Sequence, residues 1–339
     1  MERFWLIAFP TFESVVPFVF KSIMKFTIKV PATSANLGPG FDALGLALDL
    51  WNETTVTTNN INELETDTRI KRILISVKGE GAGRLISNEK NLIVRTAQKL
   101  ADRAGKTLPI FHAECVNQIP LSSGMGSSAA TIVTGLLMGN TLLGNPFSTE
   151  DILNLACEME GHPDNVAPAL LGGLVVSTVN EGKVLAHPIH IGADIHVTIA
   201  LPDFYLPTRQ ARAALPKKIS MKNAVHNISR AVLVTEAFRT GDLILLGEAM
   251  TDKLHQPYRL KLIPGAVSAM EAAKEAGAAA VALSGAGPSL IAFSSKAEAG
   301  IPQGDNVGES MRRAFEAAGL QARIFQLRVS GQGAGIQVR

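Results

Sequence analysis

Residues 120–130 read Pro-Leu-Ser-Ser-Gly-Met-Gly-Ser-Ser-Ala-Ala, and this segment decides how the rest of the sequence is interpreted. Gly124 and Gly126 precede two serines and a run of small and apolar residues, which predicts a buried helix over residues 127–142. Backbone N–H groups, serine hydroxyls and the positive end of the helix dipole would then point toward one anion. The segment therefore predicts a phosphate-binding loop; the alternative is a plain glycine turn before a buried helix.

Two better-known phosphate motifs fit this segment less well. A Walker loop requires a lysine after its second glycine, and residues 120–130 contain none. The spacing Gly124-x-Gly126-x-x-Ala129 agrees with a dinucleotide fingerprint. However, the helix leads into Gly144-Asn-Pro and a second expected helix, not a parallel strand, and no acidic residue follows at the required distance of about 20 positions. A nicotinamide-dependent oxidoreductase is therefore the weaker alternative.

Composition sets the outer limits of the interpretation. The chain has 339 residues, 46% hydrophobic and 18% charged, which excludes a disordered protein and suggests about two domains. A net charge of +2 offers no field of one sign for nucleic acid or a membrane surface, and no uncharged apolar run is long enough to span a membrane. The two cysteines lack metal-site or disulfide spacing, which is typical of a cytoplasmic protein. Six of the 18 aromatic residues fall in the first 20 positions, so we expect residues 1–24 to be an extension outside the fold.

Hydrophobic periodicity predicts two successive groups of strands and helices. The first group has strands at residues 25–30, 54–58, 72–78, 110–116 and 171–179, and helices at 91–105, 127–142 and 148–160. The second group has helices at residues 222–239, 264–276 and 306–318, and strands at 279–284, 290–294 and 322–329. We therefore expect an α+β protein with one unit over residues 25–190 and another over 191–339.

Three further segments combine glycine turns with polar side chains. Residues 31–42 read Pro-Ala-Thr-Ser-Ala-Asn-Leu-Gly-Pro-Gly-Phe-Asp, a stiff loop that suits polar recognition but is also compatible with an ordinary turn. Residues 158–165 read Glu-Met-Glu-Gly-His-Pro-Asp-Asn. A solvated helix end accounts for the two glutamates, but it accounts less well for the last four residues, which lead into an apolar segment. Residues 283–290 read Leu-Ser-Gly-Ala-Gly-Pro-Ser-Leu, which fits either a phosphate contact or a tight hairpin.

Together the four segments resemble the small-molecule kinase superfamily that includes galactokinase, homoserine kinase, mevalonate kinase and phosphomevalonate kinase. The resemblance extends from Lys25 to the C-terminus, and residues 31–42 and 160–168 are most similar to homoserine kinases. It implies an N-terminal ATP-binding kinase domain with a left-handed crossover, similar to the second domain of ribosomal protein S5, and a C-terminal ferredoxin-like domain. It also implies a cytoplasmic, ATP- and Mg²⁺-dependent enzyme, as a monomer or homodimer, that phosphorylates the L-homoserine hydroxyl in threonine biosynthesis. A same-fold kinase of a mevalonate-type alcohol is the nearer alternative.

The resemblance also implies a role for each residue of the expected site. The ATP-binding set comprises Pro120, Leu121, Ser122, Ser123, Gly124, Met125, Gly126, Ser127, Ser128, Ala129 and Ala130. The substrate-binding set comprises Asn36, Asp42, His162, Arg212, Arg259 and Gly285, and the catalytic set comprises Asp164, Asn165 and Thr208. Mg²⁺ would be held by Ser128 and by either Glu158 or Glu160. The two arginines suit a carboxylate and Asp42 suits an ammonium group, while Asp164 is expected to act by position and charge, with base catalysis as the minority view.

Overall fold

The computed structural model describes residues 23–58, 73–192, 195–295 and 303–338. Residues 1–22, which make up most of the expected N-terminal extension, lie outside this range. Within it, no helix has the length and apolar character needed to cross a membrane.

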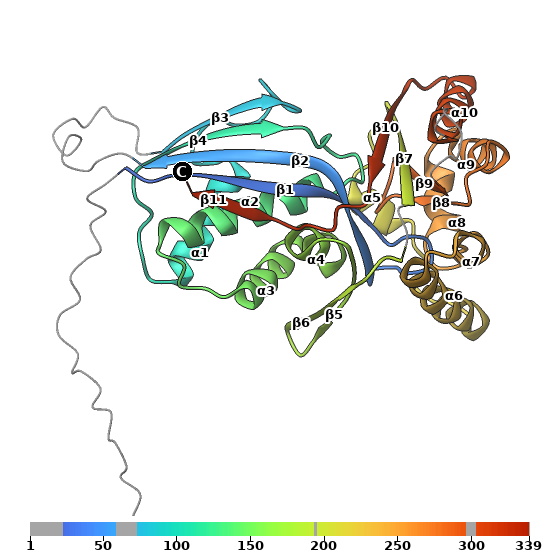
Figure 1. The fold of residues 1–339 in the computed structure, drawn as a ribbon, viewed down its shortest axis with the longest axis horizontal. Helices are drawn as coiled ribbons and strands as arrows, with labels where there is room; N and C mark the ends of the chain where they lie inside the picture. The colour runs from blue at the N-terminus through green and yellow to red at the C-terminus, as the bar shows by residue number, and fades with distance from the viewer. Residues whose placement is uncertain (1–22, 59–72, 193–194, 296–302, 339) are drawn as a thin grey trace, which may run out of the picture.

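The first unit is a mixed sheet with helices packed on one face (Figure 1). Its described strands are β1 (Lys25–Ala35), β2 (Leu44–Thr58), β3 (Ile73–Gly79), β4 (Phe111–Asn117), β5 (Leu174–Asn180), β6 (Lys183–Ile189) and β11 (Gly335–Val338), with the order β11-β1-β2-β4-β3 and β5 and β6 branching from β2. Its described helices are α1 (Leu92–Arg103), α2 (Ser127–Leu142), α3 (Thr149–Glu160) and α4 (Pro163–Leu171). Strands β3 and β4 pair in parallel through the α1 crossover, as a β-α-β unit requires.

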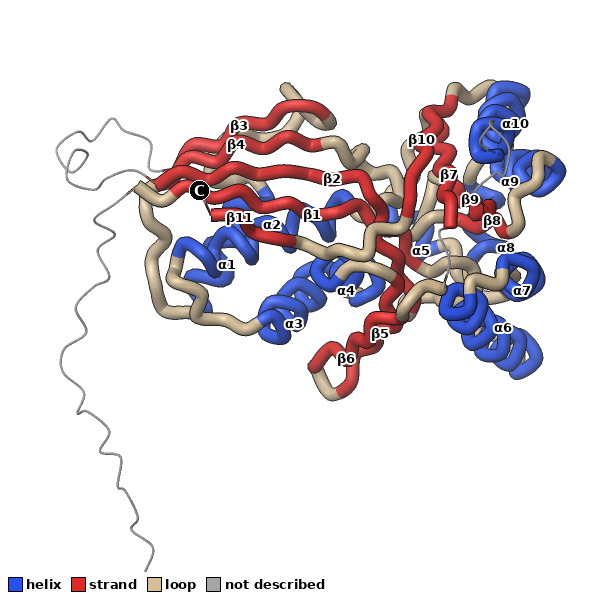
Figure 2. Tube along the Cα trace, viewed as in Figure 1, coloured by secondary structure: helices blue, strands red, loops and turns tan. Residues whose placement is uncertain are grey.

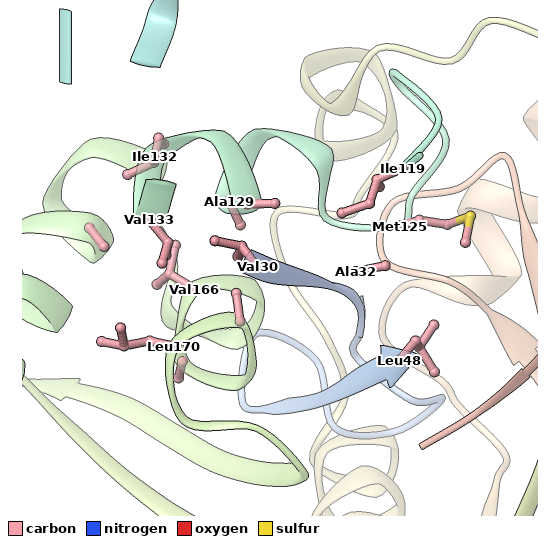
Figure 3. Close-up of a cluster of buried hydrophobic side chains, with 14 of the residues drawn as sticks. Val30, Ala32, Leu48, Ile119, Met125, Ala129, Ile132, Val133, Val166 and Leu170 are labelled. Atoms are coloured by element: carbon pink, nitrogen blue, oxygen red, sulfur yellow. The ribbon is translucent and has the colours of Figure 1, made fainter. Parts of the chain in front are cut away.

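Helix α2 is the central buried helix that the sequence predicts. Its residues are apolar or small on every side, so it can be covered by α1 on one side and by β1 and α4 on the others. Figure 3 shows Val30 of β1 beside Val133 of α2 and Val166 of α4, and all three belong to one buried cluster. This packing fixes the start of α2, and with it the preceding glycine loop, against β1.

The second unit is an antiparallel sheet in the strand order β10-β7-β9-β8. Its described strands are β7 (Ile195–Pro202), β8 (Ala280–Leu283), β9 (Leu290–Ser295) and β10 (Ala322–Arg328). Its described helices are α5 (Thr208–Ala213), α6 (Met221–Thr240), α7 (Leu243–Ala249), α8 (Gln256–Arg259), the 3₁₀ helix η2 (Leu260–Leu262), α9 (Ala266–Glu275) and α10 (Gln303–Ala317). The strand order with intervening helices is ferredoxin-like, and in Figure 2 these strands run across the direction of those in the first sheet.

Two expectations about the chain's organisation differ from the structure. The last strand, β11, pairs antiparallel with β1, so the end of the chain returns to the first sheet although residues 191–339 were expected to form the second unit. The strand expected at residues 171–179 begins only at Leu174, because α4 occupies the preceding residues. Pro168 lies inside α4, and a proline within a short segment conceals a helical pattern.

Candidate active site

The glycine loop is held by hydrogen bonds within itself. Ser123 Oγ donates to the carbonyl oxygen of Pro120 at 2.8 Å and accepts from the N–H of Met125 at 3.2 Å. Gly124 and Gly126 have φ values of 79° and 71°, in the left-handed region that favours glycine. The loop therefore presents its backbone in a fixed conformation at the N-terminus of α2.

Both glycines are also required by close approach of neighbouring groups. A Cβ atom at Gly124 would lie 2.4 Å from the carbonyl oxygen of Ser284, and one at Gly126 would lie 1.9 Å from Thr33 Oγ1. The N–H of Thr33 donates to the carbonyl oxygen of Met125 at 3.1 Å. The loop thus fits tightly between β1 and the turn after β8.

Three of the four motifs lock together at this point. The hydroxyl of Ser284 donates to the carbonyl oxygen of Gly124 at 2.7 Å and lies 2.9 Å from Ser34 Oγ. Asn36 Nδ2 donates to the carbonyl oxygen of Gly285 at 2.7 Å, and the N–H of Gly285 donates to the carbonyl oxygen of Ala35 at 3.1 Å. The turn at Ser284 and Gly285 in the second unit therefore packs directly against the glycine loop.

A cavity of about 190 Å³ opens where the four motifs meet. It brings together most of the expected site residues: Asn36, Asp42, Ser122, Ser123, Gly124, Gly126, Ser127, Ser128, Glu160, His162, Asp164, Asn165, Thr208, Arg212, Arg259 and Gly285. The others lie outside its wall: Pro120, Leu121, Met125, Ala129, Ala130 and Glu158. Pro120, Leu121 and Ser122 line a neighbouring cavity of about 630 Å³, so Ser122 borders both.

The two candidate metal-binding glutamates have different surroundings. Ser128 Oγ donates to Glu160 Oε2 at 2.7 Å beside the cavity. Glu158 points elsewhere and pairs with Lys99 at 2.7 Å and Arg103 at 3.2 Å. The hydrogen bond from Lys99 is the main cause of its lowered pKa. Of the two glutamates, Glu160 is therefore the one that contacts Ser128 beside the cavity.

The start of α4 carries a buried carboxylate and its imidazole partner. Asp164 is almost fully buried, and its Oδ1 lies 2.5 Å from His162 Nδ1. Burial acts to lower the pKa of His162, but the hydrogen bond and charge of Asp164, with the charge of Glu160, raise it overall. Asn165 Oδ1 accepts a hydrogen bond from Thr33 Oγ1 at 2.9 Å. The N-terminus of α4 thus adds a hydrogen-bonded imidazole–carboxylate pair to the cavity.

Asp42 and Arg212 pair with each other across the two units. Arg212 Nη1 and Nη2 donate to the two carboxylate oxygens of Asp42 at 3.0 and 2.8 Å. The N–H of Asp42 donates to Asn36 Oδ1 at 3.0 Å, and Asp42 and Asn36 both have left-handed backbone conformations. The sequence predicted both charged residues in the site but not their bidentate contact.

Arg259 differs from Arg212 because its charge has no carboxylate partner. It is 1% exposed, and among the described residues no carboxylate oxygen lies within salt-bridge distance of it. Its contacts are long: 3.4 Å to the carbonyl oxygen of Ala211 and 3.3 Å each to the carbonyl oxygen of Gly285 and to His255 Nδ1. Burial, followed by the charge of Arg212, lowers its pKa to about 10. A buried cation of this kind is ready to receive an anion.

An aromatic ring that the sequence interpretation did not single out lies between the charged groups. Phe41 stacks on His255 with ring centroids 5.2 Å apart, and the guanidinium carbons of Arg259 and Arg212 lie 5.1 and 5.7 Å from its centroid. Its ring gives both guanidinium groups a common surface. Phe41 lies inside the segment at residues 31–42, so its position beside Asp42 was the available signal.

This geometry, a glycine loop at a helix N-terminus that shares a cavity with two arginines and three carboxylates, is that of a small-molecule kinase. Residues 91–173 match the GHMP kinases N terminal domain and residues 234–301 match the GHMP kinases C terminal domain. The chain belongs to the GHMP kinases and, within them, to the homoserine kinase family.

The second step of that assignment depends on relatives that align over nearly the whole chain. A homoserine kinase of Moorella thermoacetica is 41% identical over 307 residues, covering 91% of this chain and 98% of that protein. A homoserine kinase of Carboxydothermus hydrogenoformans is 42% identical, covering 91% and 95%. The crystal structure of homoserine kinase from Cytophaga hutchinsonii aligns with a TM-score of 0.79 and 30% identity, covering 97% and 100%. The expected kinase fold is confirmed, whereas the oxidoreductase alternative is wrong: helix α3, not a parallel strand, follows α2.

Proposed function

We propose that this chain transfers the γ-phosphoryl group of ATP to the side-chain hydroxyl of L-homoserine, giving O-phospho-L-homoserine and ADP in threonine biosynthesis. The observation that carries the proposal is the two-sided cavity, with the glycine loop on one side and the Arg259, Arg212 and Asp42 charges on the other. One side suits phosphates, and the other suits a small zwitterion. The enzyme works in the cytoplasm, where its nucleotide substrate is available.

The nucleotide occupies both cavities that meet at the glycine loop. Its phosphates lie against residues 122–128, where backbone N–H groups and the N-terminus of α2 favour negative charge. Its nucleoside lies in the larger neighbouring cavity, whose wall includes Pro120, Leu121 and Tyr205. Ser122, which borders both cavities, marks the point where the nucleoside gives way to phosphate.

Mg²⁺ fits the oxygen donors of Ser128 and Glu160. The hydroxyl and the carboxylate are already in contact at the N-terminus of α2, and oxygen ligands are those that Mg²⁺ prefers. Among the described residues no group of three or more His, Cys, Asp or Glu side chains that could hold a metal ion is present. Phosphate oxygens and water would supply the remaining ligands of the ion. When bound, the ion supplies charge neutralisation at the phosphates.

The amino-acid substrate is recognised by its two opposite charges. Arg259 receives the carboxylate, because its own charge is buried and without a carboxylate partner. Asp42 holds the ammonium group, and the Arg212 fork turns from Asp42 toward the carboxylate as the substrate enters. The contact between Asp42 and Arg212 neutralises two charges that would otherwise stand bare beside the buried Arg259.

The chemical step depends mainly on position and charge. A loose phosphoryl-transfer transition state needs alignment of the hydroxyl and neutralisation of the phosphate charge more than it needs a strong base. The carboxylate of Asp164 is already hydrogen-bonded to His162, so this pair fixes the local field at the N-terminus of α4. Asn165 and Thr208 line the same cavity and orient the hydroxyl.

An ADP-release assay with L-homoserine, mevalonate and shikimate tests the proposed substrate. We expect ADP formation that depends on L-homoserine, with the other two alcohols close to the rate without acceptor. Mevalonate carries a carboxylate but no ammonium group, so Asp42 would have no partner in it. No homoserine-dependent ADP would overturn the proposal, and mevalonate-dependent ADP would favour the alternative alcohol kinase.

A further inference from the structure

His255 lies immediately before helix α8, and its side chain is fully buried behind the amino-acid side of the cavity. The cavity wall does not include it, yet both of its ring nitrogens have partners. Nε2 lies 2.7 Å from the carbonyl oxygen of Gly38 in the first unit, and Nδ1 lies 3.3 Å from Nη1 of Arg259 in the second. The imidazole therefore connects a loop of one unit to a cavity-lining cation of the other.

The two contacts define one neutral tautomer of this imidazole. A carbonyl oxygen can only accept a hydrogen bond, so Nε2 carries the proton, whereas a guanidinium can only donate, so Nδ1 offers its lone pair. Burial, followed by the charge of Arg259, outweighs the opposing charges of Asp252 and Asp42 and lowers the pKa of His255. A neutral ring is therefore the form that the surroundings favour.

The backbone and the ring face of His255 are held as firmly as its nitrogens. Asp252 Oδ2 accepts the N–H groups of His255 and Gln256 at 2.9 and 2.6 Å. The same oxygen lies 3.6 Å from Nε2, which is farther than the carbonyl oxygen of Gly38. Phe41 stacks on the ring with centroids 5.2 Å apart. Because its position is fixed from every side, His255 can hold its partners in turn.

Arg259 depends on this imidazole for its orientation. Its other hydrogen bonds are long, at 3.4 Å to the carbonyl oxygen of Ala211 and 3.3 Å to that of Gly285. All three contacts use Nε and Nη1, and among the described residues Nη2 has no hydrogen-bond partner. Nη2 is therefore left for a ligand in the cavity that Arg259 lines.

We propose that His255 is a positioning residue that holds Arg259 ready for the substrate carboxylate and ties it to the loop carrying Asp42, so that the site favours an α-amino acid. This role rests on the proposed function, since it presumes an amino-acid substrate. Gly38, Phe41 and Asp42 belong to one loop, and His255 contacts the first two. A guanidinium that is fixed before the ligand arrives lowers the entropic cost of binding.

His255→Gln tests the contact with Arg259. The amide nitrogen of glutamine can still donate to Gly38, but the side chain offers no acceptor in the place of Nδ1. We expect KM for L-homoserine to rise about 10-fold or more, while kcat and KM for ATP stay within about threefold of the wild type. Steady-state kinetics measures this, and an unchanged KM for L-homoserine, or an equal rise in KM for ATP, overturns the proposal.

Gln256→Met is the matched control. Gln256 is the next residue, is also buried, and accepts the N–H of Leu283 on its Oε1 at 2.7 Å. The substitution removes a buried hydrogen bond from the same turn, but one that does not involve Arg259. It should lower Tm and leave KM for L-homoserine within about twofold. If it raises this KM as much as His255→Gln does, disturbance of the turn is the cause and the proposal fails.

Two alcohols that each lack one charge of L-homoserine test which partner His255 serves. As competitive inhibitors of O-phospho-L-homoserine formation, 4-hydroxybutyrate offers only the carboxylate and 3-aminopropan-1-ol only the ammonium group. In His255→Gln, Ki should rise about 10-fold for the first and stay within about twofold for the second. Both constants describe the folded enzyme, so partial unfolding of the variant does not alter them. Equal changes in the two Ki values, or inhibition of the wild type by neither alcohol, contradict the proposal.

His255→Asn supplies the rescue. Its amide oxygen can take the place of Nδ1 and accept from Arg259, while the donor to Gly38 is lost. KM for L-homoserine should rise less than in His255→Gln, and a larger rise would assign the role to the Gly38 contact instead. A wild type that forms no ADP with L-homoserine ends the proposed function itself. An active wild type whose KM is matched by His255→Gln removes only the role of His255.

Discussion

In the proposed active site, the phosphate side and the amino-acid side are built from different parts of the polypeptide. The phosphate side consists of backbone groups and hydroxyls in a loop between Pro120 and Ser128, held by Ser123 and by the turn at Ser284. The amino-acid side consists of charged side chains, with Arg212 and Arg259 from the second unit facing Asp42 from the first. Substitutions should therefore act through shape on one side and through charge on the other.

The largest effect is expected on the phosphate side, from Gly124→Ala. The added Cβ would lie 2.4 Å from the backbone oxygen of Ser284 and would need a left-handed φ, so the loop must move. We expect kcat/KM to fall by about 10³-fold, because N–H groups aimed at developing charge lose their alignment. Steady-state kinetics with both substrates measures this.

A control at a second glycine distinguishes two effects of the Gly124 substitution, the displacement of the loop and the strain of a left-handed backbone. Gly144 has a φ of 82°, yet a Cβ there meets no atom within 4 Å. Gly144→Ala should lose about 1 kcal/mol of stability and keep its activity. Equal kinetic damage in both variants would mean that strain, and not the contact with Ser284, controls the loop.

Arg259→Met tests the amino-acid side and should separate function from stability. Loss of the guanidinium should raise KM for L-homoserine by about 10²- to 10³-fold while KM for ATP changes little. Stability should stay equal or increase, because the variant removes a buried charge that lacks a carboxylate partner. Kinetics and thermal unfolding together measure this, and a large loss of stability with an unchanged KM would assign Arg259 a structural role.

The same contrast explains how much of the site could be predicted from sequence. The backbone groups of the phosphate side come from one short stretch of sequence. The glycines and serines of residues 120–130 therefore predict both the loop and the start of α2 at Ser127. Charge pairing depends on segments 170 positions apart, such as Asp42 and Arg212, and nothing local indicates whether they contact each other or a substrate. Glu158 and Glu160 could not be separated for the same reason: their partners come from other helices.

The fold shows a similar division. Strongly periodic elements such as α1 and α10 were predicted within a few residues of their observed bounds. Helix α4 was missed because Pro168 interrupts its pattern, although a glycine, Gly172, follows its last residue. The sequence near β11 gives no sign that this strand pairs with β1. The pairing joins residues at opposite ends of the chain, such as Phe26 and Val338.

Glu160→Gln tests the one carboxylate that we assign to the phosphate side. We expect kcat to fall by about 10²-fold and the Mg²⁺ concentration for half-maximal rate to rise, because the carboxylate beside Ser128 is lost. Glu158→Gln is the matched control, since Glu158 pairs with Lys99 and Arg103 away from the cavity. Mg²⁺ titrations of both variants measure the difference, and a larger effect of Glu158→Gln would reverse the assignment.

Asp164→Asn tests whether the carboxylate of Asp164 acts as a general base. If Asp164 acts by position and charge, kcat should fall by about 10- to 10²-fold, because the amide keeps the shape but weakens the contact with His162. A fall of about 10⁴-fold or more with KM little changed would instead identify Asp164 as the general base. Single-turnover rates with saturating L-homoserine distinguish the two outcomes.

The smallest effect is a pH dependence of stability from the His162–Asp164 pair. Burial opposes protonation of His162, but Asp164 and Glu160 raise its pKa above the ordinary value of about 6.5. A raised pKa in the folded state means that the stabilisation is complete below the ordinary value and is lost as pH rises through the folded pKa. The free energy of unfolding of the wild type minus that of His162→Gln should therefore be larger near pH 5.5 than near pH 8.5, two points that bracket the ordinary pKa. His187→Gln, at an exposed position on β6, controls for the general change of charge. A difference that grows toward high pH would show that burial outweighs Asp164 at this site.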